Sequence, residues 1–262
     1  MLPLDGRTAR YSNFSNRAYS NGYSSNEYLR RIYDFNQMDF EAAFDQFMTL
    51  LSRNPAQVYK SSYYRKQTKN QWARDDPAFA VIQILLLIAS ACAYGVAFSA
   101  GSFWHFFTII FKMVGIQYVG VGVFIASLGS WFANARLRQV RAGTVAQRVE
   151  WAFAWDAHCN AHAPAFLLLH VVQYFLLPLL MGRSWLALAA ANTLYAASLL
   201  AYVYVTHLGY RALPFLSNTE VYLYPAGVII LLYVISLLLG LVGVSCNMTR
   251  IVSHFYFDMT LH

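Results

Sequence analysis

Five apolar runs, each about long enough to cross a lipid bilayer, constrain this chain more than any other feature. A spanning helix needs about 20 consecutive apolar residues. The runs cover about residues 77–99, 107–132, 163–181, 185–205 and 222–244. Of the 262 residues, 58% are hydrophobic and 12% are charged, whereas a soluble domain carries about 25% charged residues. The sequence therefore predicts an all-α, multi-pass membrane protein with five transmembrane helices between residues 77 and 244.

Small residues recur at every fourth position in three of these runs. The rows are Ala89, Ala93 and Ala97; Gly122, Ala126 and Ser130; and Ala189, Thr193, Ala197 and Ala201. Such rows let helices approach closely where lipid offers no hydrophobic drive. They predict a compact bundle, and the alternative is a seam between two copies of the chain.

The distribution of lysine and arginine predicts the orientation in the membrane. Residues 1–76 carry eleven of these cations, and the segments 133–162 and 206–221 carry five more. The opposite connections and the tail carry two, Arg183 and Arg250. Because cytosolic loops are enriched in lysine and arginine, we expect a cytosolic N-terminus and a lumenal tail over residues 245–262. The sequon at Asn13 then stays unglycosylated, and that at Asn247 lies too close to the bilayer to be reached.

The region before the first span has its own organisation. Residues 1–27 are polar and predicted to be disordered, and residues 28–76 are predicted to form a cytosolic, amphipathic and basic helical segment. Within it, apolar residues from Phe40 to Leu51 follow helical spacing, Asp39 is a candidate N-cap, and Asn54-Pro55 ends the run. Such a helix could lie on the membrane surface or pack beneath the bundle.

The stretch "YYRKQTKNQWARDDPAF" at residues 63–79 is the main candidate for a binding surface. Its predicted partner- or lipid-binding residues are Lys60, Arg65, Lys66, Lys69, Trp72 and Arg74. Three functions remain open for them: anchoring to anionic lipids, docking of a partner protein, or RNA binding through cations and aromatic rings. We interpret Asp76 as the N-cap of the first span and Pro77 as its first helical residue.

The stretch "EWAFAWDAHCNAHAP" at residues 150–164 is the candidate for a metal site. His158 and His162 share a helix face and Asp156 lies beside them, as in zinc or iron sites. Glu150 or His170 would have to supply a further ligand. The alternative is a polar hinge where the chain enters the membrane.

Other polar residues have no assigned role at this stage. Inside the predicted spans these include Lys112, His170 and Asn192. Lys112 is close enough to a helix end to reach the interface with its long side chain. The three cysteines are widely spaced and predict no disulfide framework. Cys159 and Cys246, near membrane borders, are candidates for palmitoylation.

Four segments together resemble a known family. They are "RRIYDFNQMDFEAAF", "YRKQTKNQWARDDPAF", "EWAFAWDAHCNAH" and "YVTHLGYRALPFLSNTEVYLYP". They resemble the Unc-fifty (uncoordinated-fifty) family of multi-pass Golgi membrane proteins over about residues 28–257. The resemblance implies five spans, a cytosolic N-terminus and a role in vesicular transport. Family members are linked to the exchange factors that activate Arf GTPases and to surface delivery of nicotinic acetylcholine receptors. One has been described as an RNA-binding protein of the inner nuclear membrane.

From these observations we expect a Golgi membrane scaffold rather than an enzyme, with no cofactor. Its expected partners are an Arf guanine-nucleotide exchange factor and anionic membrane lipids, with receptor cargo and RNA as further candidates. Two alternatives stay open at this stage. One is a membrane-embedded metal-dependent lipid enzyme that uses Asp156, His158 and His162. The other is RNA binding through the basic segment 53–74.

Overall fold

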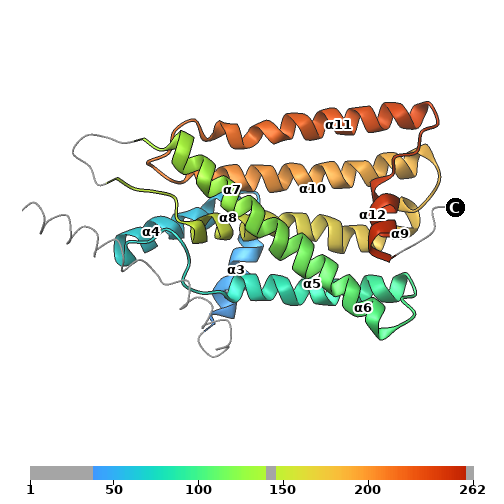
Figure 1. Ribbon diagram of the computed structural model, residues 1–262, viewed down its shortest axis with the longest axis horizontal. Coiled ribbons are helices and arrows are strands. Elements are labelled where there is room, and N and C mark those ends of the chain that lie inside the picture. The colour runs from blue at the N-terminus through green and yellow to red at the C-terminus, as the bar shows by residue number, and fades with distance from the viewer. Residues whose placement is uncertain (1–37, 140–145, 258–262) are drawn as a thin grey trace, which may run out of the picture.

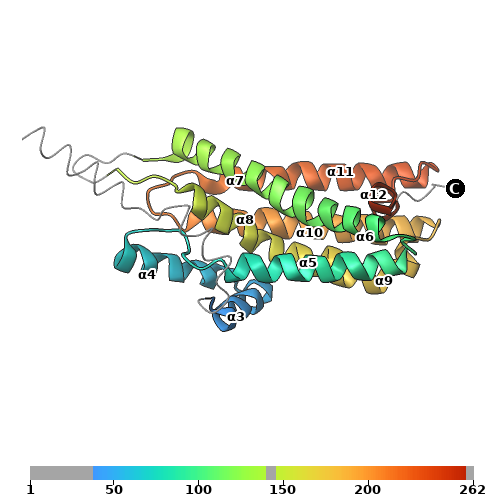
Figure 2. The ribbon, with the colours of Figure 1, turned by 60° about the horizontal axis from the view of Figure 1, so that its bottom comes forward.

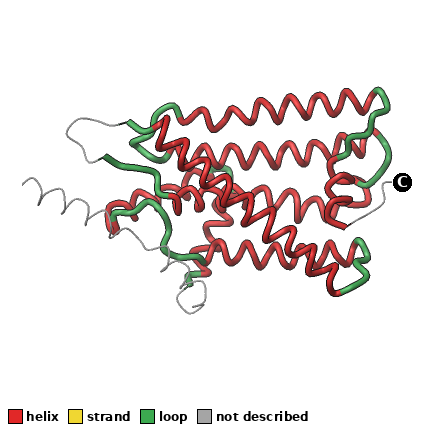
Figure 3. Tube along the Cα trace, in the orientation of Figure 1, coloured by secondary structure: helices red, strands yellow, loops and turns green. Residues whose placement is uncertain are grey.

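The computed structural model describes residues 38–139 and 146–257, so the predicted disordered segment 1–27 lies outside the described residues. The described residues form helices joined by short loops and contain no β-strand, only an isolated bridge between Arg138 and Leu216 (Figure 3). Most helices run side by side along the long axis of the molecule (Figures 1 and 2). The predicted all-α class is confirmed.

Five helices in the described chain are long and apolar enough to cross a membrane, as predicted. The first span is α5 (Ala78–Ala97); the second joins α6 (Phe103–Ile110), η3 (Phe111–Gly120), α7 (Val121–Phe132) and η4 (Ala133–Leu137); the third joins α8 (Trp151–Phe166), η5 (Leu167–Val172) and α9 (Gln173–Leu180); the fourth is α10 (Trp185–Arg211); the fifth joins η6 (Thr219–Leu223) and α11 (Tyr224–Leu241).

The third helix begins at Trp151 and not near residue 163, where the apolar run starts. Residues 151–162 are therefore helix, and the proposed hinge is wrong. The helix also continues through Pro164, and it is followed by a π-helical segment at Leu167–Val172. Proline removes a backbone donor from the helical ladder, and π-helical turns are one way in which a helix absorbs such a local disturbance.

The α8 helix is the centre of the core. Most of its residues from Phe153 to Phe166 are buried, and it packs against both α7 and α10. In contrast, α11 buries no residue and lies at the edge of the bundle beside α10 (Figure 1). An apolar helix without buried residues is expected where lipid covers its surface.

The rows of small residues differ in what they contact. Gly122, Ala126 and Ser130 are the buried residues of α7, so this row packs inside the bundle as predicted. A Cβ atom added at Gly122 would lie 2.3 Å from Nε2 of His158, which shows how closely α7 approaches α8. On α5 the prediction is wrong, because Ala89 is exposed and the buried residues include Ala91.

Between residue 38 and the first span, the structure describes three short helices: α3 (Phe40–Leu51), η2 (Pro55–Tyr59) and α4 (Lys60–Lys69). Asp39 caps α3 as predicted, since its Oδ1 accepts a hydrogen bond from the backbone N–H of Ala42 at 2.9 Å. The predicted amphipathic helix is therefore present. It crosses the axis of the bundle instead of running along it, and α4 lies beyond it at the end of the molecule (Figures 1 and 2).

The cap of α5 differs by one residue from the prediction. The helix begins at Ala78 with Pro77 at the N-cap position, so Asp76 stands one residue outside it. Asp76 nevertheless accepts a hydrogen bond from the N–H of Ala78 at 2.9 Å through Oδ1, and from the N–H of Asp39 at 2.8 Å through Oδ2. One carboxylate thus joins the starts of α3 and α5.

The residues after the last span fold back onto the bundle as α12 (Met248–Phe257). Asn247 donates to the carbonyl oxygen of Leu180 at 2.8 Å, and Tyr256 Oη donates to Oε1 of Gln117 at 2.5 Å. Residues 248–257 of the predicted tail therefore form a helix that closes this end of the bundle.

Candidate functional site

A polar seam joins the basic stretch to the centre of the bundle. The backbone N–H of Arg74 donates to Oδ2 of Asp156 at 2.7 Å, and its Nη2 donates to Oδ1 of Asn160 at 2.7 Å. Gln46 of α3 donates to the same Asn160 oxygen at 2.6 Å. Because buried polar groups are costly unless they are hydrogen-bonded, these contacts fix the segment before α5 against α8.

Glu150, at the N-cap position of α8, extends this seam. Its carboxylate accepts hydrogen bonds from the backbone N–H groups of Trp72 and Ala73, each at 3.2 Å. Both donors belong to residues that are at most 3% exposed. The Nε1 of Trp72 donates to Oε1 of Gln147 at 3.3 Å. Glu150, a possible metal ligand by its sequence position, instead binds the backbone of the basic stretch and holds it against α8.

Three of the six predicted binding residues are part of this internal structure. Trp72 is buried, with its ring 5.5 Å from Tyr63 and 5.9 Å from Phe215. Arg65 Nη2 donates to the carbonyl oxygen of Trp72 at 3.2 Å, and burial lowers the pKa of this guanidinium from its usual value. Arg74 lies 5.0 Å over the ring of Phe79. These residues hold the fold, with Trp72 buried and the two arginines half-buried.

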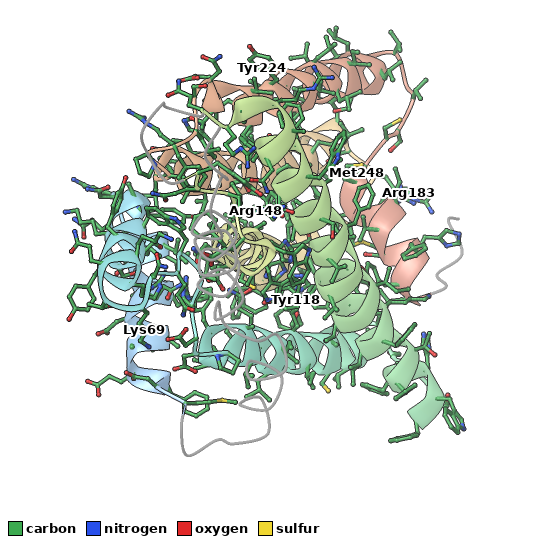
Figure 4. All side chains as sticks on the ribbon, turned by 60° about the vertical axis from the view of Figure 1, so that its left-hand side comes forward. Lys69, Tyr118, Arg148, Arg183, Tyr224 and Met248 are labelled. Atoms are coloured by element: carbon green, nitrogen blue, oxygen red, sulfur yellow. The ribbon has the colours of Figure 1, made fainter. Side chains whose placement is uncertain are left out.

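The other three predicted residues are lysines near the outer surface of α4. Lys60 and Lys69 are exposed, and Lys69 forms an ion pair with Asp75; Figure 4 shows Lys69 near the outer side of the molecule. Lys66 is half-buried, and its Nζ donates to the carbonyl oxygen of Asn70 at 3.0 Å. Burial lowers the pKa of its ammonium group. Several side chains of α4 are exposed, and we call three of them, Lys60, Tyr64 and Lys69, the α4 face.

The predicted metal ligands do not converge. His158 Nδ1 lies 2.8 Å from the hydroxyl of Tyr202, and His162 Nδ1 lies 3.1 Å from Oε1 of Gln83. Asp156 bonds to the segment before α5, as described above. Over the described ranges, no three histidine, cysteine or acidic side chains are grouped so that they could hold a metal ion. The enzyme alternative is not supported, and the histidines serve as hydrogen-bonding groups between helices.

Gln83 and Tyr118 are further partners of α8 on neighbouring helices. Gln83 Nε2 donates to the carbonyl oxygen of Cys159 at 2.7 Å, and Tyr118 Oη donates to Sγ of Cys159 at 3.2 Å. Figure 4 shows Tyr118 well inside the molecule. Cys159 is 2% exposed, which makes it inaccessible to palmitoylation in the folded protein. A polar residue such as Gln83 within an apolar run indicates a partner across the bundle, and Cys159 and His162 are its partners.

Lys112, His170 and Asn192 also have partners. Lys112 Nζ donates to the carbonyl oxygen of Phe255 at 2.8 Å and lies 5.2 Å over its ring. His170 Nδ1 lies 3.0 Å from Ser90 Oγ, and Asn192 Nδ2 donates to Ser236 Oγ at 2.9 Å. Each contact joins two different helices, so these residues stabilise the bundle and its closing helix.

The fold and the seam define a class of protein: a multi-pass helical membrane protein with a polar core and a basic cap. The chain matches the model of the UNC-50 family over residues 28–257, and it belongs to this family. It is 44% identical to "Protein unc-50 homolog" of Dictyostelium discoideum over 236 residues, 90% of this chain and 88% of that protein. The corresponding human protein is 41% identical over 231 residues, 88% of this chain and 86% of that protein. No solved structure matches.

Family membership confirms the resemblance seen in the sequence motifs. The family is not a known enzyme family. RNA binding through the segment 53–74 is not supported either, because Arg65, Trp72 and Arg74 make internal contacts.

Proposed function

We propose that this protein is a Golgi membrane scaffold that recruits or modulates an Arf guanine-nucleotide exchange factor. In this proposal its N-terminus and its basic cap face the cytosol and its C-terminus faces the lumen. By recruiting the exchange factor it supports vesicular transport and the surface delivery of receptors such as nicotinic acetylcholine receptors. The roles that the family resemblance implies support this proposal.

The charge distribution on the fold is the observation that carries the proposed orientation. The exposed cations at one end of the bundle include Lys60 and Lys69 of α4, Arg136 and Arg148 near α7 and α8, and Arg211 of α10. Arg183 is at the other end, in the turn between α9 and α10. Because lysine and arginine are retained on the cytosolic side of a membrane, the basic end is the one expected to meet cytosolic partners and anionic lipids.

The α4 face is the surface that we propose for recruitment. Lys60 lies one turn before Tyr64 on the same side of the helix, Lys69 is exposed at the other end of α4, and Tyr64 is 70% exposed. The helix is held to the bundle by Arg65 and Trp72, so the surface is fixed in position. A preorganised surface avoids the entropy of ordering a flexible segment on binding. An acidic patch with an apolar centre is the complementary chemistry.

The test is capture of an Arf exchange factor by full-length protein in nanodiscs. We expect recovery by the wild type and loss by a Lys60→Glu, Lys69→Glu double variant. An Arg183→Glu variant, which reverses a cation at the opposite end, is the matched control and should retain recovery. Equal recovery with the wild type and the double variant would refute the α4 face as the docking site. Proximity labelling from the N-terminus in cells tests the Golgi location separately.

A further inference from the structure

The α3 helix carries a second apolar face that its packing against the protein does not use. Phe40 is 37% exposed, Phe44 is 58% exposed and Met48 is 53% exposed. Residues four apart lie on the same side of a helix, so these three side chains form one row. A row of large exposed apolar side chains on a helix marks a surface that something apolar covers.

The neighbouring side of α3 faces the bundle. Ala43 and Leu50 are buried, and the ring of Phe47 lies 6.5 Å from that of Phe79 on α5. The hydrogen bond from Gln46 to Asn160 holds the helix to α8. Phe79 is in the first turn of the first span and Asn160 lies within the third span. The α3 helix is therefore fixed beside the ends of two membrane-spanning helices.

The polar side of α3 faces away from the exposed apolar row. Asp45 and Thr49 line a cleft of about 420 Å³ together with Arg65 of α4 and with Arg74. At 100° per residue, Asp45 and Thr49 lie about 100–140° around the helix from Phe44. Because α4, which lies beyond α3 at the end of the molecule (Figures 1 and 2), also lines this cleft, the exposed apolar row is on a different side of α3 from the polar cleft.

From this geometry we infer that α3 lies in the plane of the membrane, with Phe40, Phe44 and Met48 inserted into the lipid leaflet at the basic end. The occupant of the face is lipid, because α3 packs on the start of α5, a membrane-spanning helix whose exterior is apolar. Leu85, two turns into α5, is 54% exposed on that exterior. An amphipathic helix in this position buries its apolar face at the boundary of headgroups and acyl chains. The inference does not depend on the proposed recruitment of an exchange factor.

The arrangement has a structural consequence for the basic cap. The N–H of Asp39, at the start of α3, is bound by Asp76 at the start of α5, and Gln46 shares Asn160 with Arg74. A helix seated in the leaflet and tied to the seam in this way fixes the height of the α4 face above the membrane.

A spin-label scan of full-length protein in nanodiscs tests this inference. Single cysteines replace Phe40, Phe44 and Met48 in turn, with Glu41, Asp45 and Thr49 as the matched polar positions. The background carries Cys92→Ser and Cys246→Ser, and the buried Cys159 is retained. For labels at the apolar positions we expect collision rates that are high with oxygen and low with a water-soluble nickel chelate. Labels at the polar positions should show the reverse, with a period of about 3.6 residues.

Three results would overturn the inference. Nickel accessibility at Phe44→Cys equal to that at Asp45→Cys would place the row in water. Low accessibility to both reagents would place it against protein. Dipolar broadening between labels at position 44 would show that a second copy covers the row. Retained thermal unfolding transitions show that each variant is folded, and the three apolar positions provide independent measurements if one variant fails.

Discussion

Removal of the Glu150 carboxylate is the perturbation for which the structure gives the clearest expected magnitude. In Glu150→Ala, the N–H groups of Trp72 and Ala73 lose their acceptor, although both residues are buried. Hydrogen bonds to a charged group contribute about 1.5–3 kcal/mol each. At 3.2 Å these bonds are at the long end of the usual range, so we use the lower value. Loss of both bonds then weakens the segment by about 3 kcal/mol.

Hydrogen–deuterium exchange of the full-length protein in nanodiscs measures this effect. A change of about 3 kcal/mol corresponds to roughly a hundredfold change in an equilibrium constant, since about 1.4 kcal/mol is a factor of ten. We therefore expect the amides of Trp72 and Ala73 to exchange about a hundred times faster in Glu150→Ala. In Glu150→Gln one acceptor oxygen remains, and the increase should be several-fold.

Glu220→Ala is the matched control, because it removes an exposed carboxylate from η6, at the start of the fifth span. Exchange at Trp72 should not change in this variant. If Glu150→Ala leaves exchange of the 70–75 segment unaltered, the carboxylate does not hold the basic stretch and our account of the seam is refuted. An equal increase in the control would show a general effect of charge instead.

Three further predictions follow from the packing of the bundle. Gly122→Ala should lower the unfolding temperature in detergent, because the added Cβ atom would clash with His158 and overpacking costs about 1–3 kcal/mol. In Gly227→Ala the added Cβ atom has no neighbour within 4 Å, so the unfolding temperature should not fall. Equal effects of the two substitutions would contradict this account. Asn247 should carry no glycan, because it is 2% exposed and its side chain is hydrogen-bonded to Leu180. A glycosidase-sensitive shift in gel mobility that Asn247→Gln abolishes would contradict this prediction. Burial raises the pKa of Tyr256 to about 12. Protection of α12 from hydrogen exchange, corrected for the intrinsic pH dependence of exchange, should therefore be constant below about pH 10 and fall as the pH rises toward 12. The same fall in Tyr256→Phe would exclude this cause.

The five spans could be predicted because hydropathy is a local property of the sequence. The cap of α3 was predictable for a similar reason, since Asp39 and Ala42 lie within one turn of each other. The start of α8 was not predictable in this way. Its polar residues meet Gln83, Tyr118 and Tyr202, which are 40 or more residues distant in the sequence. A hydropathy pattern shows that His158 is polar, but it does not show which residues of other helices form hydrogen bonds with it.

The candidate site shows the same limit on a finer scale. Arg65 and Lys69 are four residues apart in one basic stretch and have the same charge. Yet Arg65 bonds to the backbone of Trp72, whereas Lys69 pairs with Asp75 on the outside of α4. The planar guanidinium can donate to several acceptors at once, as Arg65 does to Ser61, Ser62 and Trp72. The choice of arginine over lysine was the only local sign of this difference.

This division of the basic stretch determines how its mutations must be interpreted. Reversal of Arg65 or Arg74 would release α4 from the bundle, so loss of partner binding in such variants would report loss of structure. Reversal of Lys60 leaves the seam intact and changes only the exposed surface. A docking role for the α4 face therefore requires that Lys60→Glu abolish capture while exchange at Trp72 stays slow. Fast exchange at Trp72 together with lost capture, as expected for Arg74→Glu, would indicate only that the scaffold beneath the surface had opened.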